Sequence, residues 1–231
     1  MSEVRFYQVG GSVRDSFLGL KSKDIDYAVE AASFNEMREA ILGRGGTIFL
    51  ETPQYLTIRA RVPELGACDF VLCRKDGAYN DGRHPENVEV GTILDDLARR
   101  DFTINAIARA EDGEIIDPYD GSTDLLVYQL LRCVGSPKKR FGEDGLRILR
   151  AIRFSVTKQL IVDDQIWKYL IDEEGCIHAI QGVSLERIRE ELNKCFSFNT
   201  NETLEFFDNF PIFRKFLFNK ALWLKPTTEE K

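Results

Sequence analysis

The sequence predicts an α+β protein with one strand-containing core domain and a smaller helical unit after it. Up to about residue 134, short strand-forming segments are interspersed with helix-forming ones, whereas the chain from Val162 onward is helix-forming and rich in aromatic residues. In addition, 231 residues exceed the usual size of one compact domain but fall short of two large ones. The first observation predicts the α+β class, and the second predicts one core domain with a smaller unit attached to it.

Composition excludes several classes of protein. Hydrophobic residues make up 43% and charged residues 30% of the chain, and no apolar run approaches the roughly 18 residues that a membrane span requires. The start, MSEVRFYQVGG, has neither secretory nor transit character, so we expect a cytoplasmic protein without membrane contact. The five cysteines are widely spaced and lack a C-x-x-C pair, which predicts reduced, packed thiols.

Charge and histidine content narrow the possible ligands. His84 and His178 are the only histidines and are isolated, so a metal would have to bind carboxylates, which favours Mg²⁺. A net charge of −7 argues against non-specific coating of nucleic acid. A local basic strip can still hold a phosphate backbone, so nucleic acid remains open as a partner.

The first elements have the pattern of a phosphate-binding turn. Residues 5–9 predict a strand, which runs into Gly10 and Gly11 and then a short helix over 13–18. Glycines let a ligand approach the backbone, and the N–H groups at the start of the helix point at it. Arg14 would add a charge-assisted contact. A Gly-Gly pair alone is more often a simple tight turn.

The next segment, residues 23–29, alternates polar and apolar residues as a half-buried strand does, which puts Asp24 and Asp26 on one face. Two carboxylates so close are unfavourable without a cation but suit one or two Mg²⁺ ions in phosphoryl transfer. On its own, a D-x-D is more often a solvated strand end. Its position soon after a phosphate-type turn makes the metal-binding interpretation stronger.

A helix over 33–43 is predicted by a Ser-x-x-Glu capping box and a final glycine. Strands are predicted next over 47–50, 55–62 and 67–73. Asp69 lies in the last of them among apolar neighbours, where an unpaired carboxylate would be costly. Two interpretations are equally open: a third acid near the metals, or a salt bridge to Arg59 or Arg61.

Residues 74–91 are rich in Gly, Asp, Asn and Pro and predict a long loop. A helix is predicted over 92–108, with Arg99, Arg100 and Asp101 on its polar side. A guanidinium next to a carboxylate suits a nucleotide, because one can hold phosphate or base and the other the ribose hydroxyls. Two short strands are predicted after it, at 114–117 and 129–134.

Residues 140–156 predict one amphipathic helix that carries Glu143, Asp144, Arg147 and Arg150 on one face. Taken alone, such a face is more often an ordinary solvated surface with internal ion pairs.

The rest of the chain predicts helices and aromatic packing. Ser184 is predicted to cap a helix over 185–196 with an apolar stripe, and the phenylalanines of 202–223 are interpreted as core. These features predict a small helical unit.

Five blocks occur in a characteristic order and spacing: VGGSVRDSFLG, KDIDYAV, LARRDFTINAIA, DPYDGSTDLL and FGEDGLRILRAIRF. Over about residues 6–156 they resemble the class II tRNA nucleotidyltransferases and the related bacterial poly(A) polymerases. SLERIREEL, at 184–192, extends the resemblance to about residue 197. It implies a nucleotidyltransferase head with a mixed, mostly antiparallel sheet over 1–135. A helical neck with the nucleotide-selecting helix over 136–197 and a short helical segment over 198–231 would follow.

The resemblance also implies an activity: addition of CCA to tRNA 3′ ends from CTP and ATP. Asp24 and Asp26 would be the catalytic residues that hold two Mg²⁺ ions, and Gly11 and Arg14 would contact the triphosphate. Two alternatives remain, a poly(A) polymerase acting on other RNA 3′ ends and an inactive RNA-binding relative. The sequence does not specify an oligomeric state.

The remaining nucleotide contacts implied by the family lie further along the chain. Arg100 and Asp101 would sit at the ribose, and Asp144 and Arg147 would read the Watson–Crick edge of CTP or ATP. The residues expected towards the phosphates are Arg150 and Arg153. One departure from the family is Gly145, which stands where a proline is usual.

Overall fold

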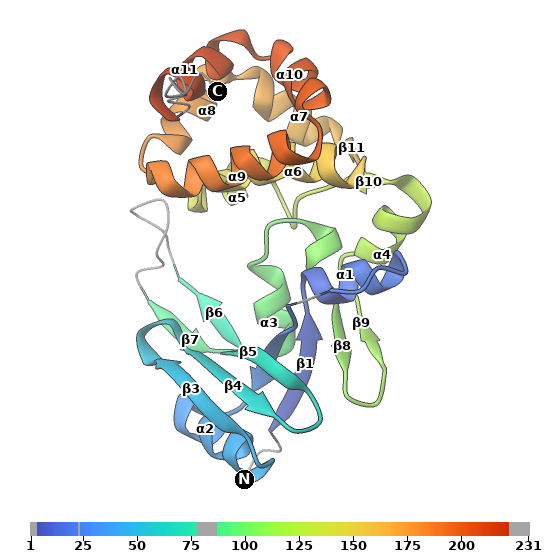
Figure 1. Ribbon diagram of the computed structural model, residues 1–231, viewed down its shortest axis with the longest axis vertical. Helices are drawn as coiled ribbons and strands as arrows, with labels where there is room; N and C mark the ends of the chain where they lie inside the picture. Colours follow the sequence, from blue (N-terminus) through green and yellow to red (C-terminus); the bar gives the residue numbers. More distant parts are fainter. Residues whose placement is uncertain (1–3, 23, 78–86, 222–231) are drawn as a thin grey trace, which may run out of the picture. The chain divides into compact units, whose positions relative to one another are not determined.

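The computed structural model describes residues 4–22, 24–77 and 87–221 (Figure 1). They form two compact units, one comprising the described residues up to Val134 and the other those from Gly135 onward. The first unit combines a sheet with helices and the second is almost wholly helical, which confirms the α+β class. In the described residues, no helix has both the length and the apolar character needed to cross a membrane.

A seven-stranded sheet organises the first unit, in the order β3-β4-β5-β2-β1-β8-β9. Its strands are β1 (Arg5–Val9), β2 (Asp26–Glu30), β3 (Thr47–Thr52), β4 (Thr57–Val62), β5 (Gly66–Leu72), β8 (Ala108–Ala110) and β9 (Ile115–Ile116). Strands β2 and β5 pair in parallel and the other neighbours pair antiparallel. The sheet is therefore mixed and mostly antiparallel, as the resemblance implies.

The register brings distant residues of the sequence to one edge of this sheet. Asp26, at the start of β2, lies opposite Val9 at the end of β1 and opposite Asp69 in β5. The glycine turn that follows β1 and the carboxylates of β2 and β5 thus meet at the same place.

Short helices and turns complete the first unit. They are α1 (Gly11–Phe17), α2 (Phe34–Gly43), α3 (Ile93–Ala98), α4 (Gly121–Thr123), η1 (Pro53–Tyr55), η2 (Thr103–Asn105) and η3 (Asp124–Tyr128), with β10 (Leu130–Leu131) after them. The predicted cap of α2 is present, since Ser33 Oγ accepts a hydrogen bond from Glu36 N at 3.1 Å. The Glu36 carboxylate accepts from Ala32 N (2.6 Å) and so closes the box one residue earlier than predicted.

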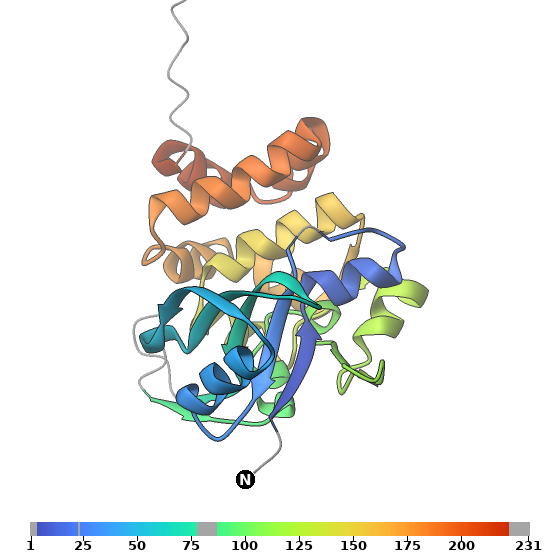
Figure 2. The same cartoon turned by 60° about the horizontal axis from the view of Figure 1, so that its bottom comes forward.

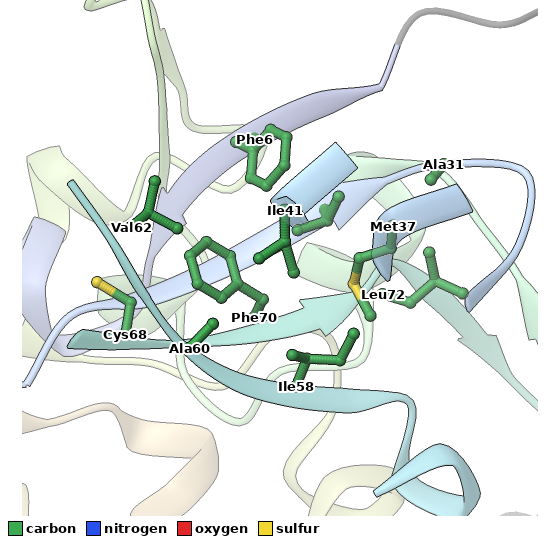
Figure 3. Packing of buried hydrophobic residues seen from close by; sticks show 11 residues of the cluster. Phe6, Ala31, Met37, Ile41, Ile58, Ala60, Val62, Cys68, Phe70 and Leu72 are labelled. Carbon is green, nitrogen blue, oxygen red and sulfur yellow. The ribbon is translucent and has the colours of Figure 1, made fainter. Parts of the chain in front are cut away.

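One face of the sheet is buried beneath α2, as Figure 2 shows. Met37 and Ile41 of α2 are fully buried and point into a cluster with Phe6 of β1 and Phe70 of β5 (Figure 3). The rings of Phe6 and Phe70 meet edge to face with centroids 5.9 Å apart. This core holds β1, β2 and β5 in register and so fixes the edge that carries the acids.

Several predicted elements of the first unit were wrong in extent. The helix expected over 92–108 ends at Ala98, because the Asp101 carboxylate bonds to Phe102 N (2.8 Å) and Asn105 Nδ2 (3.0 Å) and holds a different local turn. The loop expected over 74–91 contains a hairpin of β6 (Arg74–Asp76) and β7 (Val88–Val90) at its ends. The predicted strands near 114–117 and 129–134 are shorter in the structure.

The second unit consists of helices around an apolar and aromatic core. Its elements are α5 (Pro137–Glu143), α6 (Leu146–Lys158), β11 (Ile161–Val162), α7 (Asp164–Ile171), α8 (Glu173–Ile180), α9 (Leu185–Phe198), α10 (Thr200–Asp208) and α11 (Pro211–Ala221). The predicted apolar stripe of α9 is buried at Ile188, Leu192 and Cys195. Ser184 is the N-cap residue of α9, but its side chain makes no capping hydrogen bond. All five cysteines are buried free thiols, as predicted.

The single helix expected over 140–156 is two helices. Asp144 lies between α5 and α6 in an extended conformation (φ −153°, ψ 107°), so it does not share a helix face with Arg147. A side chain at Gly145 would collide with the backbone of Ala179 in α8. Glycine is required here because the two backbones approach closely.

Candidate functional site

The carboxylates predicted to bind metal line one hollow of about 460 Å³ at the start of β2. Its walls are formed by Asp24, Ile25, Asp26, Phe49, Arg59, Ala67, Cys68 and Asp69. Asp26 is the first residue of β2 and Asp24 lies in a bend before it, so the predicted strand begins later than expected. Lys23 lies outside the described residues. The hollow still brings both acids together.

Negative charge accumulates at this hollow. Desolvation raises the pKa of Asp26, and the neighbouring carboxylates of Asp69 and Asp24 raise it further, while Arg100 and Arg59 act in the opposite direction. Within the described ranges, no three or more His, Cys, Asp or Glu side chains are grouped as a metal site. Because the carboxylates of Asp24, Asp26 and Asp69 lie near one another in this hollow, a divalent cation would relieve the repulsion between them.

Asp69 is held by a bidentate salt bridge. Arg59 Nε and Nη2 donate to the two carboxylate oxygens of Asp69 at 2.6 and 2.7 Å. Of the two interpretations left open for Asp69, the structure contains the salt bridge. The arginine neutralises one of the carboxylates beside Asp26.

The glycine turn lies against Arg100. Gly10 has φ +70° and ψ −133°, a conformation that is nearly restricted to glycine, and a Cβ there would lie 3.1 Å from Arg100 Nη1. Helix α1 begins at Gly11 without a side-chain cap. The turn before α1 therefore lies beside the Arg100 guanidinium, and phosphate binding at this place stays a prediction.

Asn105 connects three of the predicted site residues. Its Oδ1 accepts from Arg14 Nη1 (2.6 Å), its Nδ2 donates to Asp101 Oδ1 (3.0 Å), and its backbone oxygen accepts from Arg100 Nη1 (3.3 Å). Asn105 is 6% exposed. The sequence interpretation missed this residue, although an amide inside the apolar run TINAIA is a signal, since a buried amide requires partners.

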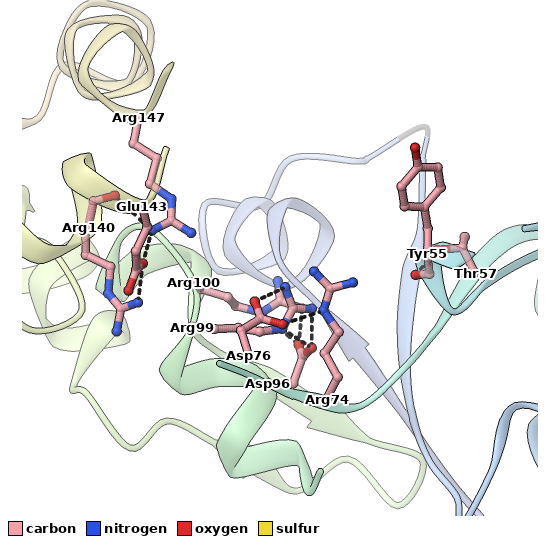
Figure 4. A network of polar contacts seen from close by, with 10 residues as sticks. All are labelled: Tyr55, Thr57, Arg74, Asp76, Asp96, Arg99, Arg100, Arg140, Glu143 and Arg147. Atoms are coloured by element: carbon pink, nitrogen blue, oxygen red, sulfur yellow. Dashed lines mark hydrogen bonds and ion pairs between the residues drawn. The ribbon is translucent and has the colours of Figure 1, made fainter. Parts of the chain in front are cut away.

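Asp96 is a second residue that the sequence interpretation missed. It is 1% exposed, and each of its carboxylate oxygens serves one arginine (Figure 4). Oδ1 accepts from Arg99 Nε (3.0 Å) and Nη2 (2.5 Å), and Oδ2 accepts from Arg100 Nε (3.2 Å) and Nη2 (2.8 Å). Burial alone would raise the pKa of Asp96, but the two guanidinium groups hold it below its usual range. Asp96 thus orients Arg100.

In the second unit, the predicted base-reading residues have partners of their own. Glu143 Oε2 accepts from Arg140 Nη1 (2.7 Å) and from Arg147 Nη1 (2.6 Å), as Figure 4 shows. Asp144 accepts from Leu146 N (3.0 Å) at the start of α6 and from Arg187 Nη2 (2.8 Å) of α9. The side chains of Asp144 and Arg147 therefore bond to different neighbours, although Arg147 N donates to the backbone oxygen of Asp144 at 3.0 Å.

The two remaining predicted arginines lie on α6 beside an aromatic ring. The guanidinium carbon of Arg150 is 5.5 Å from the centroid of the Phe154 ring, and that of Arg153 is 4.1 Å from it. Arg153 Nε also bonds to Glu191 Oε2 at 2.5 Å. Glu191 is 4% exposed, so Arg153 helps to join α6 to α9.

Comparison with known proteins identifies relatives along most of the chain. Residues 6–131 match the family described as the poly A polymerase head domain. A "CCA-adding enzyme" of Limosilactobacillus reuteri (strain DSM 20016) is 36% identical over 195 residues, which cover 81% of this chain and 44% of that protein. The chain therefore spans less than half the length of this relative.

Two solved structures share the fold. The Bacillus stearothermophilus CCA-adding enzyme in complex with CTP has a TM-score of 0.75 at 27% identity, covering 88% of this chain and 47% of that one. The Thermotoga maritima CCA-adding enzyme complexed with tRNA has a TM-score of 0.73 at 26% identity, covering 94% and 49%.

Proposed function

Because this chain belongs to the poly(A) polymerase head-domain family, we propose that it adds CMP, CMP and AMP to tRNA 3′ ends from CTP and ATP without a template. The observation that carries the proposal is the meeting of the Asp24 and Asp26 carboxylates with the Gly10 turn and Arg100 at one sheet edge. The similarity to CCA-adding enzymes over 81% of the chain supports this activity. Its RNA substrate would be met in the cytoplasm, the location expected from the sequence.

The cofactor would be Mg²⁺. The donor set fits, since Asp24 and Asp26 offer carboxylate oxygens. The pKa of Asp26 is raised first by burial and then by the neighbouring carboxylates, and a cation would relieve that second effect. When bound there, Mg²⁺ would lower the pKa of the attacking RNA 3′-hydroxyl and neutralise charge on the phosphates.

Residues of the first unit would hold the nucleotide. The backbone at Gly11 and the guanidinium groups of Arg14 and Arg100 would bind the triphosphate, and Arg100 with Asp101 would reach the ribose. Asn105 stabilises this arrangement, because it bonds to both Arg14 and Asp101. The binding groups are therefore oriented before the nucleotide arrives.

Residues of the second unit would select the base. Asp144 accepts hydrogen bonds and Arg147 donates them, which complements the amine and ring acceptors of C and A and rejects the reversed pattern of G and U. The base would replace Arg187 as a partner of Asp144 and Glu143 as a partner of Arg147. Arg150 and Arg153 would contribute positive charge towards the phosphates.

A second candidate is a poly(A) polymerase, which the family match over 6–131 favours because such an enzyme would use the same acids. The two activities differ in the length and sequence of the added tail.

The test is extension of a tRNA transcript that lacks its 3′ CCA, incubated with Mg²⁺ and either CTP, ATP or both. We expect growth by two nucleotides with CTP and by three with both, followed by a stop. An open-ended ladder with ATP alone would favour poly(A) addition, and no extension under any condition would favour an inactive RNA-binding relative. The matched variant Asp26→Asn should abolish extension, whereas Asp112→Asn, an exposed carboxylate on the β8–β9 turn, should not.

A further inference from the structure

We propose that the exposed face of β3, β4 and β5 beside the acid hollow holds the 3′-terminal nucleotide of single-stranded RNA, with Phe49 stacking on its base and Arg61 contacting its backbone phosphate. This inference rests on the proposed function and specifies where its RNA substrate binds.

The order of the strands sets the direction from which RNA must arrive. The acid-bearing strands β2 and β5 have β1 and its glycine turn on one side and β4 and β3 on the other. Phosphoryl transfer requires the attacking oxygen and the leaving pyrophosphate to lie in line on opposite sides of the phosphorus. Because the triphosphate is assigned to the glycine turn, the RNA 3′-hydroxyl approaches over β5, β4 and β3.

The backbone of β3 turns an aromatic side chain to this side. The pairing of β3 with β4 shifts between Ile48 and Leu50, so Phe49 occupies a β-bulge. The bulge interrupts the alternation of the strand, and both Phe49 and Leu50 are 55% exposed. Phe49 lines the same hollow as the acids. A large exposed ring at the hollow that contains Asp24 and Asp26 offers a surface on which a base can stack.

Positive charge accompanies the ring. Arg59 and Arg61 alternate with buried residues along β4 and are both exposed. The guanidinium carbon of Arg61 lies 6.0 Å from the centroid of the Phe49 ring, and Arg59 is bonded to Asp69. Arg61 is therefore the cation placed beside the ring to meet a phosphate. An aromatic platform with an adjacent arginine is the chemistry by which proteins bind single strands, which favours RNA over an apolar protein partner.

The decisive experiment measures the affinity of the full chain for a 5′-labelled RNA ending in CC by fluorescence anisotropy. Phe49→Ala should raise Kd about 5- to 150-fold, the effect of losing one base–aromatic stack, whereas Phe49→Trp should retain the affinity of the wild type. Arg61→Ala should make the dependence of log Kd on log salt shallower by about 0.7, as expected for one phosphate of a single strand.

Two controls separate stacking from a general effect on folding. Leu50→Ala changes an equally exposed neighbour and should alter Kd less than about twofold. With an RNA that lacks its terminal base, wild type and Phe49→Ala should bind equally. An unchanged Kd in Phe49→Ala, or the same loss with both RNAs, would overturn the inference. Absence of nucleotide incorporation by the wild type would instead overturn the proposed function, because RNA binding is measured without catalysis.

Discussion

Replacing Asp96 with Asn should cost the first unit about 3 kcal/mol of stability. The carboxylate is 1% exposed and accepts four N–H contacts from two guanidinium groups, whereas the amide oxygen offers one neutral acceptor and the NH₂ group faces a donor. Losing one partner of a buried ion pair costs about 3–5 kcal/mol, and we take the low end because the side chains of Arg99 and Arg100 are 23% and 20% exposed.

The assay must report on the first unit alone. Trp167 lies in α7 of the second unit, so its fluorescence does not follow the first, and Trp223 lies outside the described residues. Labelling of the fully buried Cys73 thiol during a urea titration does follow it, with Cys176 as the internal reference for the second unit. With m of about 2 kcal/mol/M, the Cys73 midpoint should fall by about 1.5 M while the Cys176 midpoint stays in place.

The neighbouring carboxylate provides the matched control. Asp95 belongs to the exposed capping box of α3 with Thr92, so Asp95→Asn should cost less than about 1 kcal/mol. Affinity for CTP should also fall in Asp96→Asn, because Arg100 loses its orienting partner. A Cys73 midpoint for Asp96→Asn that matches the one for Asp95→Asn would refute the reasoning.

Three further predictions follow from the same contacts. Gly10→Ala should destabilise the first unit by about 1–3 kcal/mol in a urea titration, since φ is +70° and a Cβ would press on Arg100, whereas Gly11→Ala should cost under about 0.5 kcal/mol. Burial would raise the pKa of Glu191, but Arg153 holds that pKa below its usual value. The Glu191 carboxylate therefore stabilises the second unit fully above about pH 4.5, and this stabilisation is lost as the pH falls through the lowered pKa. Tryptophan fluorescence should show that acid destabilises the wild type more than Glu191→Gln, and an equal response would contradict this pairing. Chelation of Mg²⁺ by EDTA should stop nucleotide incorporation, and readdition should restore it; incorporation that persists in EDTA would contradict the metal assignment.

Local signals sufficed for much of the fold. β1 has the predicted bounds, because its strand pattern is followed at once by glycines, and α2 begins at the predicted Ser33 cap. These features depend on neighbours within a few residues, and the order of the five sequence blocks then indicated the head fold as a whole.

The wrong predictions of element boundaries share a physical cause. Side-chain hydrogen bonds and packing against distant residues override the local pattern of polar and apolar residues. Asp101 and Asn105 bond to each other and end the helix expected over 92–108. Asp144 is drawn out of the helix expected over 140–156 by Arg187, a partner 43 residues away that no local pattern indicates. The bulge at Phe49 is likewise set by pairing with β4.

The candidate site was predictable in its residue types but not in its connections. The sequence indicated the acids and arginines, yet the sharing of Asp96 by Arg99 and Arg100 and the bridging role of Asn105 depend on the turn after α3. Those connections explain why Arg100 lies at the Gly10 turn.

The measurement that tests the central claim most directly is sequencing of RNA 3′ ends after incubation with Mg²⁺ and all four nucleoside triphosphates at equal concentration. The substrates would be a tRNA lacking CCA and an unstructured RNA of equal length, with Asp26→Asn as the inactive control. The account predicts that tRNA acquires CCA and then stops, and that G and U are not incorporated. Tails of A alone on both RNAs, or additions that persist in Asp26→Asn, would contradict it.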